Sequence, residues 1–258
     1  MKNSSCRMAI GAGVLVLALA YAGIPAEPSA EEPPLLPVEH TFQRPVLLMR
    51  PGERITYDIR MGAMKLGSAE YHQEESVEIK GKKAEVIIFQ TRTATFKDTE
   101  TIYSDPETFL PLKIERDITK LLSQESITEI YDHKECKVVI TKRVGKREET
   151  IVIQKDAPLQ NALLLPFILR NTMKLSRHTR FTVTLPKASF QLTLQGLKDV
   201  RLPTGRCRAL YFTSNPRQFE IWISADRRRI PLKIKGFGKI GYTFLLRKYQ
   251  VQDNQGRE

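Results

Sequence analysis

Residues 221–235 read Ile-Trp-Ile-Ser-Ala-Asp-Arg-Arg-Arg-Ile-Pro-Leu-Lys-Ile-Lys, and residues 102–115 read Ile-Tyr-Ser-Asp-Pro-Glu-Thr-Phe-Leu-Pro-Leu-Lys-Ile-Glu. Each segment combines an aromatic strand pattern, an acidic turn and a second strand that opens with Pro-Leu-Lys-Ile. The acidic side chain, Asp105 or Asp226, can accept hydrogen bonds from the turn backbone. Proline suits the first residue of a strand, where no ladder donor is needed. Two interpretations stay open: one stable hairpin recurs, or the domain holds two similar β-units.

Short runs of alternating apolar and polar residues extend on both sides of these two segments. They are bounded by turn residues such as Gly62, Gly67 and Gly145, and such period-two runs are typical of antiparallel strands with one buried face. The runs cover residues 54–59, 69–71, 85–95, 126–131, 137–142, 148–153, 181–185 and 190–194. The sequence therefore predicts a mainly β fold, an antiparallel curved sheet that forms a barrel-like or half-barrel structure.

One short helix is expected at about residues 157–170. Asp156 is a good N-cap and Pro158 suits the first helical turn. Apolar residues then follow at helical spacing, and Pro166 should kink or end the helix. We expect this apolar helix to cover an open end or face of the sheet. It is either an ordinary core helix or a membrane-docking element.

The first 22 residues have the features of a secretory signal peptide: Lys2 and Arg7, an apolar run, and a small-residue site at 20–22. The apolar run is too short to span a bilayer, and Cys6 precedes it, which argues against lipidation. We therefore expect a periplasmic protein, exported by a cleavable signal peptide, with no later transmembrane segment. Residues 23–51 read as a Pro-rich extended leader, residues 52–250 as the β-rich domain and residues 251–258 as a tail.

The chain carries a formal net charge of +12, which is compatible with anionic lipid, lipopolysaccharide or envelope glycan as partners or with a generally solvated basic surface. No nucleic-acid-binding motif is present. Cys136 and Cys207 remain after processing, and they form either a disulfide or two separate buried thiols. Neither a cofactor nor a metal is expected, because the four histidines are scattered.

The search for catalytic groups favours a protein that is not an enzyme. Ser189, Ser214 and Ser224 lack a nucleophile motif, and His133 lies only three residues from Cys136, which makes a catalytic pair an unfavoured interpretation. The carboxylates Asp98 with Glu100, and Glu148 with Glu149, are interpreted as solvated-face residues rather than a glycosidase pair.

Basic residues gather in two predicted turns and the strand that follows, and arginine forks suit phosphate and carboxylate oxygens. If the turns lie at one mouth of a barrel, they would form a rim for an anionic headgroup above an apolar cavity. The candidate ligand-binding residues are Arg201, Arg206, Arg208, Arg227, Arg228, Arg229 and Lys233.

Several segments together resemble the exported bacterial family called domain of unknown function 3108 (DUF3108), across about residues 52–249. The segments are Gly52-Glu-Arg-Ile-Thr-Tyr-Asp58 with Gly67, Asp105 to Lys113, Asp156-Ala-Pro-Leu, Leu169-Arg170, Leu202-Pro-Thr-Gly205, and Trp222 to Asp226 with Pro231. The resemblance implies a periplasmic, β-rich protein without an established activity. The last hairpin is also distantly similar to those of lipoprotein-carrier (LolA/LolB-like) half-barrels, whose concave face takes acyl chains.

The expected function is a non-catalytic binding or carrier role for an amphipathic or lipid-linked component of the cell envelope. One alternative is an interaction protein of envelope assembly with a packed interior. The other is a glycan or acyl hydrolase. A cavity lined by Leu, Ile and Phe would favour the carrier, and two inward carboxylates in a cleft would favour the glycosidase.

Overall fold

The structure, a computed structural model, describes residues 49–172, 175–176, 178–237 and 241–252. The predicted signal peptide, nearly all of the predicted leader and most of the predicted tail lie outside the described residues. The strands, in chain order, are β1 (Glu53–Met61), β2 (Met64–Ile79), β3 (Lys82–Thr93), β4 (Phe96–Ser104), β5 (Pro111–Lys120), β6 (Ser123–Asp132), β7 (Lys137–Val144), β8 (Arg147–Gln154), β9 (Arg180–Thr184), β10 (Ser189–Leu202), β11 (Gly205–Asn215), β12 (Phe219–Ser224), β13 (Pro231–Gly236) and β14 (Tyr242–Val251).

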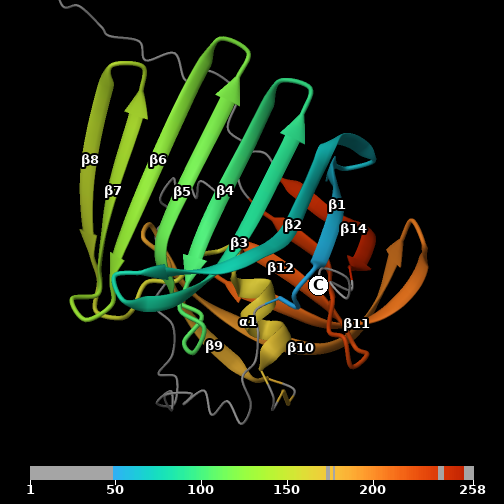
Figure 1. The fold of residues 1–258 in the computed structure, drawn as a ribbon. Coiled ribbons are helices and arrows are strands. Elements are labelled where there is room, and N and C mark those ends of the chain that lie inside the picture. Colours follow the sequence, from blue (N-terminus) through green and yellow to red (C-terminus); the bar gives the residue numbers. More distant parts are fainter. Residues whose placement is uncertain (1–48, 173–174, 177, 238–240, 253–258) are drawn as a thin grey trace, which may run out of the picture.

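The described strands form one antiparallel sheet in the order β8-β7-β6-β5-β4-β3-β2-β1-β14-β13-β12-β11-β10-β9. Consecutive strands pair throughout, and β1 pairs with β14 where the two halves of the chain meet. The sheet curves round on itself, with the long strands β3–β8 standing to one side (Figure 1). Within the described residues the edge strands β8 and β9 do not pair. The predicted mainly β half-barrel is therefore confirmed.

The repeated sequence motif occupies corresponding places in two six-stranded meanders, β1–β6 and β9–β14, of which it forms the fourth and fifth strands. In both copies the register shifts just after the proline that opens the second strand, at Leu112 and Leu232. Both copies also pair a lysine with an aromatic residue across the strands. The Lys113 amine lies 5.5 Å from the Tyr103 ring centroid, and the Lys233 amine lies 4.5 Å from that of Trp222. This correspondence favours two similar β-units, with β7 and β8 added between them.

The helix α1 (Leu165–Asn171) is shorter than predicted. The prediction of residues 157–170 was wrong at the start, because the Asn161 side chain accepts the Leu163 backbone N–H and holds this stretch in turns. Pro166 does not end the helix but lies in its first turn, where a backbone donor is not needed.

The helix packs in the core, which agrees with its interpretation as an ordinary core helix. Every residue from Leu165 to Arg170 is buried, and the Phe167 ring meets the Tyr71 ring edge-on at 5.0 Å. The helix contacts β12 and β13, so it fills the interior beneath the C-terminal strands. Among the described residues, no helix has the length and apolar character needed to span a membrane.

Three smaller predictions are settled by the structure. Gly67, expected in a turn, lies inside β2 opposite Thr93. Met49, expected in the extended leader, is fully buried in the core cluster, so the folded part starts earlier than Gly52. Cys136 and Cys207 are free and half-buried, so the disulfide alternative is wrong.

Candidate functional site

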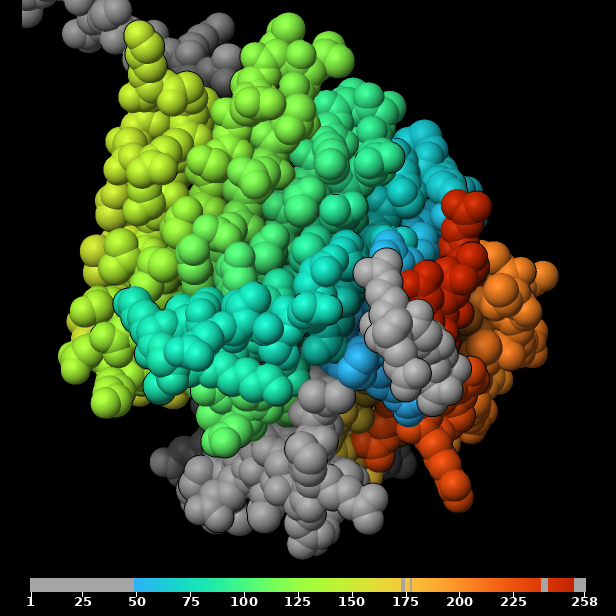
Figure 2. Space-filling view, in the orientation of Figure 1, coloured from blue at the N-terminus to red at the C-terminus, as the bar shows by residue number. Residues whose placement is uncertain are grey.

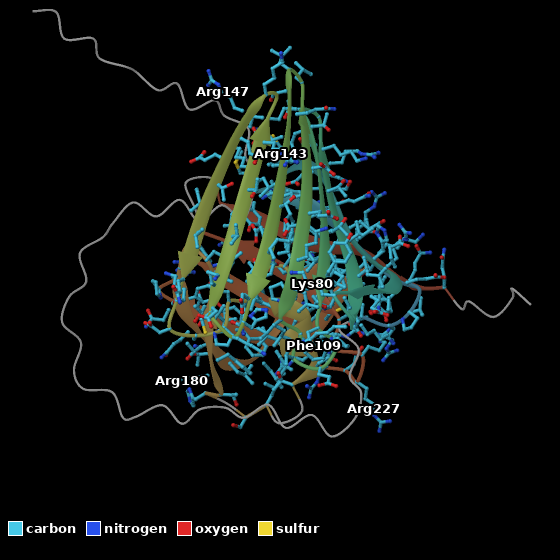
Figure 3. All side chains as sticks on the ribbon, turned by 60° about the vertical axis from the view of Figure 1, so that its left-hand side comes forward. Lys80, Phe109, Arg143, Arg147, Arg180 and Arg227 are labelled. Atoms are coloured by element: carbon cyan, nitrogen blue, oxygen red, sulfur yellow. The ribbon has the colours of Figure 1, made fainter. Side chains whose placement is uncertain are left out.

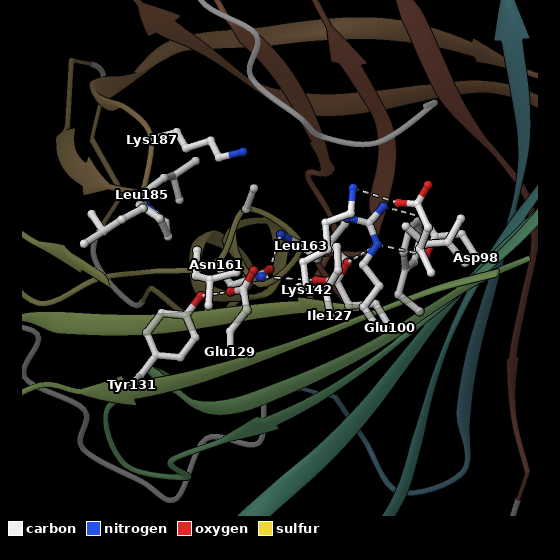
Figure 4. Close-up of a pocket in the computed structure, with 18 of the residues that line it drawn as sticks. Asp98, Glu100, Ile127, Glu129, Tyr131, Lys142, Asn161, Leu163, Leu185 and Lys187 are labelled. Carbon is white, nitrogen blue, oxygen red and sulfur yellow. Dashed lines mark hydrogen bonds and ion pairs between the residues drawn. The ribbon is translucent and has the colours of Figure 1, made fainter. Parts of the chain in front are cut away.

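A cavity of about 390 Å³ lies on the inner face of strands β3–β8. Segments 160–163 and 185–187 close it on the other side (Figure 4). Phe244 of β14 also lines it, with its ring centroid 5.8 Å from that of Phe89. The chain reaches these positions because the segment after β8 crosses to β9, where the Gln160 backbone N–H donates to the Thr184 carbonyl at 2.8 Å. The cavity therefore lies where the connection between the two β-units bridges the open side of the half-barrel.

Strand register brings residues from six strands into one transverse row on the cavity wall. Each residue of the row is directly opposite the next across the pairs from β3 to β8. The row is Phe89, Glu100, Arg116, Ile127, Lys142 and Glu149, all of which line the cavity. The row is not apparent in the sequence, because its residues lie on six strands that are joined by successive hairpins.

Arg116 organises the charged part of the wall. Its guanidinium donates from Nε to Asp98 Oδ1 at 2.9 Å and through a second nitrogen to Asp98 Oδ2 at 2.5 Å. The same Nε lies 3.7 Å from a carboxylate oxygen of Glu100. Asp98 is buried and the Arg116 side chain is only 13% exposed. A fork of this kind fixes the guanidinium in one orientation, so the cavity presents a rigid polar surface.

Two carboxyl groups that face the same space, Glu100 and Glu129, have raised pKa values. Burial raises the pKa of the Glu100 carboxyl to about 7, although Arg116 opposes this and Asn161 donates a hydrogen bond to it at 3.2 Å. Burial also raises the pKa of Glu129, which accepts a hydrogen bond from the Tyr131 hydroxyl. Near neutral pH, Glu100 can therefore serve as either a donor or an acceptor toward a bound molecule.

Apolar side chains make up much of the rest of the wall. Ile127, Ile140, Ile151 and Ile153 present aliphatic side chains from β6, β7 and β8, where Glu125, Glu129, Lys142 and Glu149 also line the cavity. The apolar lining residues are Phe89, Ile118, Ile127, Ile140, Ile151, Ile153, Ala162, Leu163, Leu185, Pro186 and Phe244. The same cavity thus offers both apolar and charged surface.

The sequence interpretation of Asp98 and Glu100 as solvated-face residues was wrong. Both line the cavity, because they share strand parity with Ile102, which is fully buried. That parity was the available signal. Glu148 is exposed as expected and pairs with Arg143, whereas its neighbour Glu149 lines the cavity.

The seven residues predicted to form an anionic-headgroup rim lie elsewhere, and none of them lines this cavity. Arg201 and Arg206 face each other across the β10–β11 hairpin. Arg208 pairs with Asp199, at 3.1 Å, and with Arg228 it lines a second hollow formed beside residues 202–208 and 224–230.

The remaining predicted rim residues have mostly structural contacts. Arg228 pairs with Asp226 at 2.8 Å. Arg229 donates to the carbonyls of Arg170 and Thr172 at the end of α1, and Lys233 stacks on Trp222. Arg227 is exposed. The headgroup role of these residues stays a prediction, and it does not concern the large cavity.

The other candidate nucleophiles make structural hydrogen bonds. The Cys136 thiol contacts the backbone carbonyl of His133 at 3.6 Å, while the His133 ring is hydrogen-bonded to the Pro111 carbonyl. The Ser214 hydroxyl accepts two backbone N–H groups, and the Ser224 hydroxyl accepts that of Ile230. Within the described residues, no group of His, Cys, Asp and Glu side chains could hold a metal ion.

Comparison with known proteins identifies the family to which the chain is similar. A family model described as "Protein of unknown function (DUF3108)" matches residues 56–247, which is most of the chain. No curated protein matches it significantly.

Two solved structures are similar in outline. One is a β-barrel-like protein of domain of unknown function DUF1849 from Brucella abortus, with a TM-score of 0.48, 12% identity, and coverage of 78% of this chain and 98% of that chain. The other, from Bacteroides fragilis, has a YmcC-like fold, with a TM-score of 0.27, 8% identity, and coverage of 78% and 96%. With TM-scores below 0.5, neither likeness supports a conclusion about this chain.

Proposed function

This chain belongs to the DUF3108 family, whose description assigns no activity, and we propose that it binds an amphipathic molecule of the cell envelope in the cavity of strands β3–β8 without converting it chemically. We propose also that the protein is exported and acts in the periplasm, as the charged and apolar pattern of residues 1–22 predicts.

The observation that carries this proposal is that one cavity offers both apolar surface and fixed polar groups. Isoleucines from three neighbouring strands offer an apolar surface to a hydrocarbon chain, which gains free energy as apolar area leaves water. Arg116 and its carboxylate partners, on the neighbouring strands β5 and β4, offer fixed hydrogen-bonding groups that set orientation. A volume of about 390 Å³ is within the usual range for small-molecule sites, roughly 300–1,000 Å³.

The charges of the lining residues indicate the polar end of the ligand. Five carboxyl groups and three basic side chains line the cavity, so it has no excess of positive charge; these residues are Asp98, Glu100, Glu125, Glu129, Glu149, Arg116, Lys142 and Lys187. Lys142 and Arg116 are already paired with Glu125 and Asp98. Since these two basic groups already have carboxylate partners, a neutral, hydroxyl-bearing head fits better than an anionic one. Envelope glycolipids have this combination of apolar chain and hydroxyl groups.

A glycan hydrolase is the second candidate, and one observation favours it. A buried carboxyl with a pKa near 7, such as Glu100, can act as a general acid at neutral pH. A second carboxyl, Glu129, lines the same cavity. If this candidate is right, Glu100→Gln abolishes turnover of a glycan substrate but preserves its binding.

The binding proposal is tested by mass spectrometry of the intact protein purified from the envelope fraction, with two tryptophan variants. Ile127→Trp fills the cavity from β6, while Ile130→Trp is the matched control, because Ile130 lies on the opposite face of the same strand and is 39% exposed. We expect the wild type and Ile130→Trp each to carry one bound molecule with a hydrocarbon chain, and Ile127→Trp to carry none.

A second measurement uses the uncharged fluorescent probe N-phenyl-1-naphthylamine with the same three proteins. Its fluorescence should rise with the wild type and the control and stay low with Ile127→Trp. Equal probe binding by all three proteins, or a wild type that is free of bound molecules and does not bind the probe, would overturn the proposal.

A further inference from the structure

The four hairpin turns at one end of the long strands form a continuous border of the sheet, which we call the hairpin rim. They connect β1 to β2, β3 to β4, β5 to β6 and β7 to β8, and in Figure 1 they lie along the upper edge. With the two flanking residues on each side, the rim comprises residues 60–65, 92–97, 119–124 and 143–148. In the space-filling view its turns lie along the upper border of the visible face (Figure 2).

Large apolar side chains are exposed on this rim, against the usual tendency of such residues to be buried. Leu121 is 82% exposed and Leu122 is 95% exposed at the tip of the β5–β6 hairpin. Met61 and Met64 flank the β1–β2 turn and are 41% and 53% exposed. Two adjacent leucines held almost entirely in water contribute nothing to the core, so folding alone does not account for them.

The same rim is strongly basic. Its 24 residues include eight basic side chains and one acidic side chain, Glu148; the basic ones are Arg60, Lys65, Arg92, Lys97, Lys120, Arg143, Lys146 and Arg147. The three turns at the other end of these strands, delimited in the same way (residues 78–83, 103–112 and 131–138), carry five basic and five acidic side chains. Charge is thus concentrated at one end of one sheet.

Part of this charge is left free by the protein. Lys146 and Arg147 are exposed and make no ion pair with any residue that the structure describes. Arg143 and Arg147 lie near the upper tips of the strands, while Arg227 and Phe109 lie at the opposite end (Figure 3). An exposed apolar tip surrounded by basic side chains is suited to bind the surface of an anionic lipid bilayer. There, lysine and arginine contact the lipid phosphates and leucine enters the acyl region.

We propose that the hairpin rim docks on an anionic membrane surface, with Leu121 and Leu122 entering the bilayer and the basic side chains contacting lipid phosphates. The cavity reaches close to this end, because Asp98, Glu125 and Glu149 line it only two residues from the ends of their strands. Docking in this orientation would bring the cavity near the lipid surface. The proposal stands on exposure and charge alone and needs no ligand in the cavity.

The test measures co-sedimentation of the full chain with vesicles of phosphatidylcholine alone and of phosphatidylcholine mixed with phosphatidylglycerol, at low and high salt. We expect binding to the mixed vesicles that weakens at high salt. Leu121→Ser with Leu122→Ser should weaken it about tenfold or more, since the apolar area no longer enters the lipid. Lys146→Gln with Arg147→Gln should weaken it roughly fivefold for each charge removed.

Two control variants separate the rim from general surface effects. Leu197→Ser removes a half-exposed leucine of β10, and Arg227→Gln removes an exposed arginine far from the rim. Both should bind vesicles like the wild type. Circular dichroism and thermal unfolding check that each variant is folded.

The proposal is overturned if the wild type binds no vesicle, if the rim variants bind as well as the controls, or if salt has no effect. It is also overturned if the leucines instead mediate self-association, which would appear as a concentration-dependent dimer that Leu121→Ser with Leu122→Ser abolishes. Because no cavity ligand is added, these outcomes leave the test with Ile127→Trp independent.

Discussion

The carboxylate of Glu53 and the guanidinium of Arg170, 117 residues apart in the chain, form a buried ion pair with N–O distances of 2.7 and 2.9 Å. Glu53 opens β1, and Arg170 lies in the last turn of α1. The Arg50 backbone N–H donates to the same carboxylate at 2.8 Å. The pair therefore ties the core helix to the strand at which the two β-units meet.

Breaking this pair should destabilise the protein strongly. Glu53→Gln leaves the Arg170 charge buried without its partner, so we expect the free energy of unfolding to fall by about 3–5 kcal/mol. Urea denaturation measures the change. The control is Glu148→Gln, which removes the exposed pair with Arg143 and should cost less than about 1 kcal/mol. Similar effects of the two substitutions would contradict the structural role of Glu53.

Glu100 should make stability depend on pH. Its carboxyl has a pKa of about 7 in the folded protein, against an ordinary value of 4.5, so the folded state holds a proton that the unfolded state releases. The contribution of Glu100 therefore becomes less favourable as pH rises from about 4.5 to 7, by up to roughly 3 kcal/mol. Glu100→Gln should gain stability relative to the wild type between pH 5 and pH 8, as urea midpoints would report.

Glu115 provides a control of opposite sign. The hydrogen bond from Lys113 lowers its pKa in the folded protein, so this carboxylate stabilises the fold above its ordinary pKa, and that stabilisation is lost as pH falls. Glu115→Gln should therefore lose stability relative to the wild type as pH rises through the acid range. If Glu100→Gln and Glu115→Gln shift in the same direction, the buried environment assigned to Glu100 is wrong.

Gly67 should not tolerate a side chain. A Cβ at this position would lie 2.1 Å from the Arg92 carbonyl oxygen on β3, so Gly67→Ala forces the two strands apart. We expect a loss of about 1–3 kcal/mol in the free energy of unfolding. Ser68→Ala, on the next residue, should change it by only about 0.5 kcal/mol. Thermal unfolding of the two variants compares them directly, and equal melting temperatures would refute the close approach.

The acidic turn residues should stabilise their hairpins to a similar degree. Asp105 accepts the backbone N–H groups of Glu107 and Thr108, both at 2.9 Å. Asp226 accepts the Arg228 N–H and the Ser224 hydroxyl. Either Asp→Ala substitution should lower the free energy of unfolding by about 1–3 kcal/mol, and the exposed Glu107→Ala should have little effect. A large cost at only one copy would show that the two hairpins differ in role.

The fold was largely predictable because strand signals are local. Alternation and turn residues predicted the hairpins, and the repeated Pro-Leu-Lys-Ile segments offered two similar β-units as one of two interpretations. The start of α1 was missed because Asp156 and Pro158 satisfy the local rules for a helix start, while Asn161 imposes turns on the chain before Leu165.

The site was harder to predict because it depends on register. Glu100 and Arg116 lie directly opposite each other only once β4 and β5 are aligned, and alternation does not fix that alignment. The basic turns containing Arg201 and Arg227 were conspicuous in the sequence, but the strand order takes them away from the cavity. The exposed leucines of the β5–β6 turn carried no signal, since adjacent apolar residues ordinarily predict burial.

The pairing of β1 with β14 has a consequence for how the protein reaches its native state. Each six-stranded meander can assemble from sequential neighbours, but the seam between them joins the first described strand to the last. Contacts between such distant segments carry a large loop-closure cost and slow folding. A chain emerging vectorially would therefore hold β1 as an unprotected edge until residues 242–251 arrive. During that interval the unpaired edge of β1 could pair with strands of other chains. A chaperone that binds the chain would therefore prevent most aggregation before synthesis or translocation is finished.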